Sequence, residues 1–318
     1  MRKLIVGSRK SRMAIAQTNE FIEAFLIKNP EFLRKDIEIK TITTSGDINQ
    51  KDRLDLIGGK GLFVKEIEQM LSNKEIDVAV HSMKDMPTKM TAGLKIAAWL
   101  PRGNHLEALV NNSNKKIMEL KTNSIIGTSS IRRRSQILSL RSDLCIKLVR
   151  GNVDTRLNKL NQGEYDALIL GYGGLKRLDL ESSISQIFTT DEILPPACQA
   201  SIGAQTIDEN NETINMISNT NHKNASIVGN LERNVLEVLQ ANCNSPIGVF
   251  ASIKHKKINL KVELFSHDGK EKYIAEESAN ISEREELASK VANMIIDQVG
   301  IEFIKELDIL KDDFNYTP

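Results

Sequence analysis

A carboxylate follows a short apolar stretch at a position suited to acid–base chemistry. Asp85 lies in residues 81–87 (HSMKDMP), directly after the apolar stretch 76–80. Such a stretch predicts a buried strand, and Pro87 restricts the backbone beside the carboxylate. Asp85 is therefore a candidate for stabilising a developing cation or for moving protons. The alternative is an aspartate that only shapes the turn before the proline.

The three cysteines differ in their sequence surroundings. Cys243 lies in residues 241–248 (ANCNSPIG), a turn-like segment where a thiol is accessible enough to react. Cys145 stands in an apolar strand, which favours a packed hydrophobic side chain, and Cys198 follows two prolines. Because there is no CxxC motif and the histidines show no ligand spacing, we expect neither a metal site nor a disulfide framework.

Arginines recur at one topological position, just after predicted strands. Arg9 follows the strand 4–7, Ser129 with Arg132 and Arg133 follows 124–127, and Arg150 follows 145–149. Helix N-termini and the guanidinium fork both bind carboxylates or phosphates. A single arginine is often only a solvated surface charge. The repetition favours a site for planar anions.

Two stretches of the sequence alternate strands with helices, a rhythm that predicts two α/β units with mainly parallel sheets. The predicted strands of the first are 4–7, 37–39 and 76–80, with a helix over 62–72. Those of the second are 124–127, 145–149 and 167–170, with helices over 129–141 and 152–162. Residues 101–104 are a predicted hinge. Ligands of such sheets bind beyond the carboxyl ends of the strands, so we expect the pair to close on a ligand.

After residues 195–196 the pattern changes to α+β. The Asn-rich segment 209–224 resembles a linker, and a helix is expected over about 225–240. Three polar–apolar alternating segments and a turn at 267–269 (HDG) predict an antiparallel sheet, followed by a helix over about 282–299. The length of 318 residues fits two or three domains.

Composition narrows the class of protein. Hydrophobic residues make up 40% and charged residues 27%, which is ordinary for a globular chain. A net charge of +1 and only 4% aromatic residues argue against a nucleic-acid partner, which favours basic surfaces interleaved with stacking aromatics. No apolar run approaches the length of a membrane span, and no secretory signal is visible, so we expect no membrane partner and a cytoplasmic location.

Eight segments in order give a specific resemblance. The chain resembles the porphobilinogen deaminase family over nearly its whole length. The segments are 7–11 (GSRKS), 44–47 (TSGD), 58–63 (GGKGLF), 81–87 (HSMKDMP), 127–133 (GTSSIRR), 150–156 (RGNVDTR), 174–178 (GLKRL) and 243–248 (CNSPIG).

The resemblance implies a fold and an activity. The implied fold is two α/β domains like type II periplasmic binding proteins plus a C-terminal α+β domain. Domain 1 would span 1–101 with 198–219 and hold the catalytic aspartate and the lid side of a cleft, with 47–60 as a candidate lid. Domain 2 would span 102–197 and bind carboxylates, and domain 3 would span 220–318 and hold the cofactor cysteine.

The implied enzyme is a hydroxymethylbilane synthase, a transferase of tetrapyrrole and haem biosynthesis. It deaminates porphobilinogen and joins four molecules head to tail into hydroxymethylbilane, releasing ammonia. The reaction starts on one dipyrromethane, bound through a thioether to Cys243. The partners expected are porphobilinogen and the growing polypyrrole chain, and the enzyme is expected to act as a monomer.

The resemblance also implies residue roles. Asp85 is the implied catalytic residue, stabilising the cation formed when ammonia leaves. The implied cofactor-binding residues are Cys243, Lys84, Ser129, Arg132, Arg133, Arg150, Gly151 and Gly173. The implied substrate-binding residues are Arg9, Ser11, Lys60, Phe63, Arg156, Arg177 and Gln199.

The sequence departs from the family at two places, and two other functions compete. Cys198-Gln199-Ala200 replaces the usual Gly-Gln-Gly, and Ala241-Asn242 replaces two glycines before Cys243. Non-glycine residues rarely adopt left-handed backbone conformations, so these changes bear on turnover. The alternatives are a non-catalytic carboxylate-binding protein on the same scaffold and a nucleic-acid binder. Neither needs Asp85 or Cys243.

Overall fold

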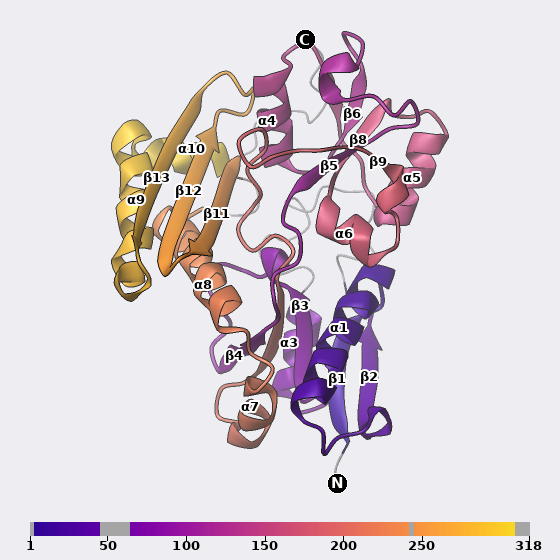
Figure 1. The fold of residues 1–318 in the computed structure, drawn as a ribbon, viewed down its shortest axis with the longest axis vertical. Helices are drawn as coiled ribbons and strands as arrows, with labels where there is room; N and C mark the ends of the chain where they lie inside the picture. The colour runs from indigo at the N-terminus through magenta and orange to yellow at the C-terminus, as the bar shows by residue number, and fades with distance from the viewer. Residues whose placement is uncertain (1–2, 45–63, 242–244, 309–318) are drawn as a thin grey trace. The chain divides into compact units, whose positions relative to one another are not determined.

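The computed structural model describes residues 3–44, 64–241 and 245–308, and the chain divides into two compact units (Figure 1). Unit 1 comprises Met1–Gly103 with Gln199–Gly229, and unit 2 comprises Asn104–Cys198 with Asn230–Pro318. The crossing after Gly103 falls inside the predicted hinge. The finer division into three domains stays a prediction.

Unit 1 is built on a five-stranded sheet. In sheet order its strands are β2 (Ile37–Ile42), β1 (Leu4–Arg9), β3 (Val78–Ser82), β10 (Ile202–Ile207) and β4 (Leu94–Trp99). β1 is parallel to β2 and β3, whereas β10 is antiparallel to β3 and β4. The sheet is therefore mixed rather than mainly parallel, because the chain returning from unit 2 supplies a strand that the sequence pattern did not reveal.

Helices cover both faces of this sheet. Helix α1 (Arg12–Lys28) buries Phe21 and Phe25 against Val6 and Val78, and Figure 1 shows it lying along β1. Helix α3 (Lys65–Ser72) buries Ile67 and Leu71 and contacts β1, β3 and β10. Successive residues of each strand point to opposite faces, so they face α1 and α3 in turn.

The Asn-rich segment contains a helix, so the linker prediction was wrong there. Helix α7 (Asn211–Ser218) begins after Asn210, whose side chain accepts a hydrogen bond of 3.2 Å from the Thr213 amide. Asparagine is a favoured N-cap residue, and Thr213 and Ile217 are buried one turn apart. The polar composition hid a capped helix with a narrow apolar side.

Unit 2 repeats the mixed topology in a second five-stranded sheet. Its strands in order are β7 (Cys145–Lys147), β6 (Ile125–Gly127), β8 (Ala167–Gly171), β5 (Glu107–Val110) and β9 (Ile184–Ile187). β6 is parallel to β7 and β8, while β5 is antiparallel to β8 and β9. Helix α4 (Ile131–Leu140) packs on one face, and α5 (Val153–Asn161) and α6 (Tyr172–Arg177) pack on the other.

The C-terminal part of unit 2 is an antiparallel sheet, as predicted. It consists of β11 (Ile247–Lys254), β12 (Lys257–Phe265) and β13 (Lys272–Asn280), and α9 (Arg284–Val299) lies against β12 and β13 (Figure 1). The remaining helices are α8 (Lys223–Val238) and α10 (Ile301–Asp308). The predicted fold class, α/β with a C-terminal α+β part, is confirmed. In the described residues, no helix combines the length and apolar character needed to cross a membrane.

Single turns of 3-10 helix complete the described elements. They are η1 (Arg34–Asp36), η2 (Met83–Asp85), η3 (Ile117–Glu119), η4 (Glu181–Ser183) and η5 (Ile281–Glu283).

Candidate functional site

Asp85 ends a 3-10 turn that the sheet of unit 1 holds in place. The turn η2 follows β3 immediately. Its first residue, Met83, donates its amide to the Ser201 carbonyl at 3.0 Å, and its buried side chain lies where a Cβ on Gly203 would come within 2.2 Å of its sulfur. Met83 is thus clamped against β10. The Asp85 side chain, which is half-buried, projects from a fixed backbone at the carboxyl end of β3.

Arg9 and Ser11 lie at the same edge of this sheet. Arg9 is the last residue of β1, and β1 runs parallel to β3. Ser11 is the N-cap of α1, and its hydroxyl accepts a hydrogen bond of 3.2 Å from the Ala14 amide. The predicted position of both residues, at the carboxyl end of a strand and the start of a helix, is confirmed. Their role toward a substrate stays a prediction.

Gln199 is buried at the point where the chain re-enters unit 1, and Lys84 contacts it. Lys84 Nζ donates to Gln199 Oε1 at 3.4 Å, and Arg102 Nε donates to the Gln199 carbonyl at 2.9 Å. The flanking residues, Cys198 and Ala200, have φ angles of +60° and +63°. Both positions therefore have a left-handed backbone that non-glycine residues adopt at a cost, which agrees with the glycines expected there from the resemblance.

A buried polar chain beneath this edge escaped the sequence interpretation. His81 Nε2 lies 2.8 Å from Gln205 Oε1, Gln205 Nε2 donates to Glu68 Oε1 at 2.7 Å, and the Thr91 hydroxyl donates to Glu68 Oε2 at 2.7 Å. Burial, together with the nearby charge of Arg9, lowers the pKa of His81 to about 4 against the opposing effect of Gln205. Neutral His81 therefore donates from Nε2. The only sequence feature that pointed to this buried chain was the presence of His81 in the HSMKD motif.

In unit 2, Arg132 and Arg133 share one buried carboxylate. Glu107 is fully buried and accepts from Arg133 Nε at 3.0 Å and from Arg133 Nη2 at 2.7 Å, and Arg132 Nη2 also donates to it. Arg132 Nη1 donates to the carbonyl of Leu194 at 2.6 Å. Burial is the main cause that lowers the pKa of Arg132, to about 10, so it stays charged at neutral pH.

Sequence reasoning missed Glu107. Its signal was a single acid at the head of the apolar run 108–110, which is unusual for a buried strand.

The next strand end places Arg150, Gly151 and Arg156 together. Gly151 has a φ angle of +107°, and a Cβ there would lie 2.7 Å from Thr155 Cγ2, so glycine is required. Arg156 Nε donates to the Gly151 carbonyl at 2.9 Å, and its Nη2 donates to Ser129 Oγ at 3.3 Å. Burial, then the charges of Arg133 and Arg150, lower the pKa of Arg156 to about 10. Positive charge is therefore concentrated at this edge.

The last predicted pair of unit 2 follows β8. Gly173 is buried in the first turn of the short helix α6, and Arg177, which is half-buried, is the last residue of that helix. Because β6, β7 and β8 are parallel, the predicted residues after all three strands lie at one edge of the unit 2 sheet. Three predicted site residues, Cys243, Lys60 and Phe63, and the candidate lid 47–60 lie outside the described residues.

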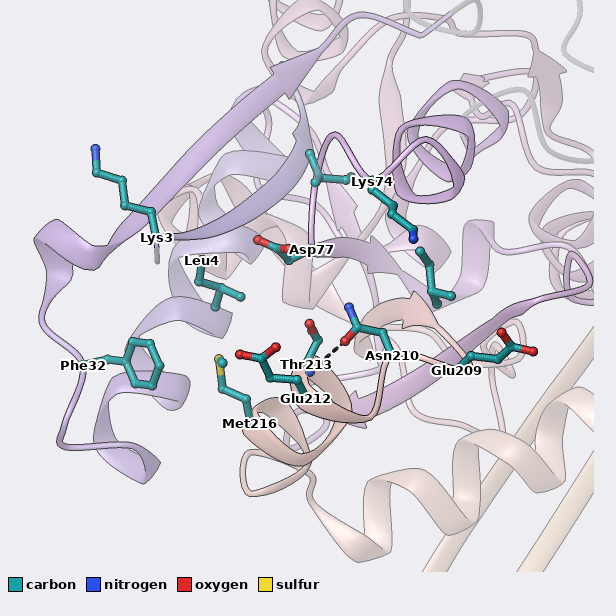
Figure 2. A pocket seen from close by; sticks show the side chains of 12 residues that line it. Lys3, Leu4, Phe32, Lys74, Asp77, Glu209, Asn210, Glu212, Thr213 and Met216 are labelled. Atoms are coloured by element: carbon teal, nitrogen blue, oxygen red, sulfur yellow. Dashed lines mark hydrogen bonds between the residues drawn. The ribbon is translucent and has the colours of Figure 1, made fainter. Parts of the chain in front are cut away.

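A separate pocket of about 480 Å³ lies at the opposite edge of the unit 1 sheet (Figure 2). Leu4 and Asp77, which stand at or just before the starts of β1 and β3, line it, as do Thr213 and Met216 from α7. None of the predicted site residues lines this pocket. Lysines and acids both surround it, so its charge favours no one class of ligand.

The donors of unit 2 fit a ligand with several carboxylates. Two arginines, Arg150 and Arg156, stand with Arg133 at one edge, and their mutual repulsion is relieved when an anion binds. Dipyrromethane with its acetate and propionate groups has this chemistry. In the described residues, no group of three histidine, cysteine or acidic side chains is placed to hold a metal ion. Fold and side chains together define an α/β protein with a cluster of arginines at one edge of its second sheet.

Comparisons with known proteins give the family. Residues 4–215 match the model described as "Porphobilinogen deaminase, dipyromethane cofactor binding domain", and residues 227–297 match "Porphobilinogen deaminase, C-terminal domain". The porphobilinogen deaminase of Staphylococcus carnosus is 37% identical over 97% of this chain and 99% of its own. That of Lysinibacillus sphaericus is 37% identical over 98% of this chain and 99% of its own. The chain belongs to the porphobilinogen deaminase family.

Solved structures give more distant likenesses. The second substrate binding domain of a putative amino acid ABC transporter from Streptococcus pneumoniae is 15% identical, with a TM-score of 0.43 over 69% of this chain and 91% of that one. A periplasmic binding protein of Salmonella typhimurium is 11% identical, with a TM-score of 0.39 over 71% of this chain and 94% of that one. At these TM-scores we draw nothing further from the likeness.

Proposed function

We propose that this protein is a hydroxymethylbilane synthase. It deaminates four porphobilinogen molecules and joins them head to tail into linear hydroxymethylbilane, with one ammonia released for each. Membership of the porphobilinogen deaminase family supports the reaction. The observation that carries the proposal for this chain is that it has both a fixed aspartate at the carboxyl edge of one sheet and an arginine cluster at the carboxyl edge of the other.

The residues of unit 2 would hold the dipyrromethane by its carboxylates. Arg150 offers a guanidinium fork, Ser129 offers a hydroxyl, and Gly151 lets the backbone turn beneath them, while Arg156, which donates to Ser129, would bind a substrate carboxylate. Cys243 would form the thioether, and β11 begins four residues after it, at Ile247. When bound, the dipyrromethane supplies the pyrrole ring to which the first substrate unit is joined.

Asp85 would act on the substrate. Its carboxylate accepts hydrogen bonds from pyrrole N–H groups, and its negative charge stabilises the cation formed as ammonia leaves. It also takes part in the proton transfers when the next ring attacks. Because the carboxylate is already in place, it need not reorganise when the cation forms. The contacts of Met83 with Ser201 and Gly203 hold the backbone turn that carries Asp85. Arg9, Ser11 and Arg177 would bind carboxylates of substrate and growing chain, and Lys60, Phe63 and Gln199 are the other residues for which the resemblance implies a role in substrate binding.

The decisive experiment measures the intact mass of the protein from a host that makes porphobilinogen. We expect an added mass of two pyrrole units, which is absent in Cys243→Ser, and ammonia release from porphobilinogen by the wild type alone. A folded wild-type protein without that added mass contradicts the proposal. Binding of porphobilinogen without ammonia release would instead support the non-catalytic carboxylate-binding protein.

We also propose that the enzyme acts as a cytoplasmic monomer. The proposal rests on the three scattered cysteines, which predict no disulfide framework, and on the family resemblance, which implies a monomer. Light scattering coupled to size exclusion tests the second point, and a mass of twice 35.6 kDa would contradict it.

A further inference from the structure

Glu107 occupies a position that chain topology, rather than sequence proximity, brings to the arginines. It is the first residue of β5, which runs antiparallel to β8 and pairs Glu107 with Gly171, the last residue of β8. The start of β5 therefore lies at the edge where β6, β7 and β8 end. Glu107 is 0% exposed, so water does not screen its charge.

Its carboxylate engages both arginines at the start of α4. Arg133 makes a bidentate contact through Nε at 3.0 Å and Nη2 at 2.7 Å, while its Nη1 donates to the Ile169 carbonyl at 3.1 Å. Arg132 Nη2 donates to the same carboxylate, and Arg132 Nη1 donates to Gln136 Oε1 at 2.9 Å. Each guanidinium plane is thus fixed from at least two directions.

The contacts leave donors on Arg133. A guanidinium carries five N–H bonds, and Arg133 uses three of them within the protein. Two N–H bonds of Arg133 therefore remain for a ligand. The charge of the same guanidinium also acts on Arg156. Glu107 alone does not neutralise two guanidinium groups, and Glu263, whose charge also acts on Arg132, is itself paired with Lys261 and Lys272. Glu107 therefore orients the pair without cancelling its attraction for an anion.

Arg156 is held differently. The two acceptors that it contacts, the Gly151 carbonyl and the Ser129 hydroxyl, are both neutral. The cations at this edge thus divide into a buried pair oriented by a carboxylate and a more accessible arginine oriented by uncharged groups. Losing Glu107 would leave two like charges buried side by side, and they would turn away from each other.

We propose that Glu107 is a positioning residue of the carboxylate site, holding Arg132 and Arg133 in the orientation in which they serve a ligand carboxylate beside Arg156. This inference rests on the proposed function and deepens it. Glu107 itself touches neither substrate nor cofactor in this role and acts only through the two arginines. The expected consequence of its loss is failure to hold the dipyrromethane and weaker capture of substrate, with little effect on the chemical step.

The test compares Glu107→Gln and Glu107→Asp with the wild type, after the wild type has shown its two-pyrrole mass. Glutamine keeps the shape but not the charge, whereas aspartate keeps the charge. For Glu107→Gln we expect a much smaller loaded fraction by intact mass and, in the loaded fraction, a KM for porphobilinogen raised roughly tenfold, as for one lost charge-assisted hydrogen bond, at nearly unchanged kcat. Glu107→Asp should restore most of both.

Glu232→Gln is the matched control, because it also replaces a fully buried glutamate of unit 2 by glutamine but lies outside the arginine cluster. Glu232 is also 0% exposed in unit 2, but it accepts from the backbone amides of Cys198 at 2.6 Å and Ala251 at 2.7 Å. The Glu232→Gln variant should have a lower melting temperature, while its folded fraction should carry the dipyrromethane as the wild type does. If Glu107→Gln does not fold, Arg133→Lys, which keeps the charge but loses the fork, must reproduce the loading defect. Wild-type loading and KM in folded Glu107→Gln, or in Arg133→Lys, overturn the inference.

Discussion

The two five-stranded sheets have the same spatial order of parallel and antiparallel strands, although the fourth strand comes last along the chain in unit 1 and first in unit 2. They differ in the groups at equivalent positions. Their registers place Gly7 opposite Ala79 in unit 1 and Gly127 opposite Leu168 in unit 2, so the two glycines correspond. Both glycines leave room for a neighbouring side chain, Ile76 in one and Tyr165 in the other. The two sheets therefore share one backbone plan and differ in the side chains at the carboxyl edge.

Polar groups sit at different depths in the two sheets. Counting along the registers, Glu107 corresponds to the buried Ile202, and Gln205 of the buried polar chain corresponds to Val110. Unit 2 therefore holds its buried charge at the rim, among arginines. Unit 1 holds the hydrogen-bonded chain from His81 through Gln205 to Glu68 deeper in the sheet, and the half-buried Asp85 follows the end of β3.

The largest expected effect comes from Asp85, which corresponds by register to Gly174 of unit 2. Asp85→Asn should lower the rate of ammonia release roughly 100-fold or more, because the developing cation loses its counter-charge. The melting temperature should stay within a few degrees. The exposed Asp208→Asn in unit 1 is the matched control and should keep wild-type turnover. Near-normal ammonia release by Asp85→Asn would remove the functional contrast between the two edges.

The buried polar chain makes unit 1 sensitive to mild acid. The unfolded chain binds a proton at His81 near its ordinary pKa of 6.5, whereas the folded pKa is about 4. The folded state thus binds fewer protons in between, so stability falls as pH drops from 6.5 toward 4. From pH 7.5 to 5 the wild type should lose about 2 kcal/mol more than His81→Gln in urea unfolding. Equal losses would contradict a neutral buried His81.

A shared aspartate tests how similarly the sheets are built. Asp77 Oδ2 accepts from the Ile5 amide at 2.8 Å, and Asp166 Oδ2 accepts from the Ile125 amide at 2.6 Å. Asp77 is buried, whereas Asp166 is exposed. Alanine at 77 should cost about 2 kcal/mol, and alanine at 166 about 1 kcal/mol or less, because water replaces an exposed partner. Urea unfolding of the two variants measures both losses of stability. A larger loss for the alanine at 166 than for the alanine at 77 would refute the burial argument.

The smallest effect concerns the turn before each of these aspartates. Lys74 has a φ angle of +60°, and its counterpart Gly163 has +78°. Lys74→Gly should stabilise by about 0.5 kcal/mol, and Gly163→Ala should destabilise by about 1 kcal/mol. Calorimetric melting of the two variants measures both signs. Equal signs would mean that the two turns are not equivalent.

Local signals predicted the elements that depend on nearby residues. The strand at 4–7 and the hairpin turn at 267–269 follow from an apolar run and from turn chemistry, and both are present, within β1 and between β12 and β13. The strand ends also placed Arg9, Asp85 and Arg150 correctly. Each of these predictions needed only a window of a dozen residues.

What the sequence could not predict depends on distant pairing. β10 consists largely of small or polar residues (IGAQTI) and becomes a strand because β3 and β4, more than 100 residues earlier, pair with it. Glu107 gained its arginine partners in the same way, through the antiparallel course of β5. The left-handed φ angles of Cys198 and Ala200 were foreseen only through the family's glycines.

The late arrival of β10 has a consequence for synthesis of the chain. β10 lies between β3 and β4 in the sheet of unit 1, yet residues 202–207 leave the ribosome after every strand of the other five-stranded sheet. The N-terminal sheet therefore waits with two unpaired strand edges while the second sheet already has all its strands. We expect the second sheet to become protease-resistant first on stalled nascent chains, and the N-terminal sheet only after residue 207 has emerged.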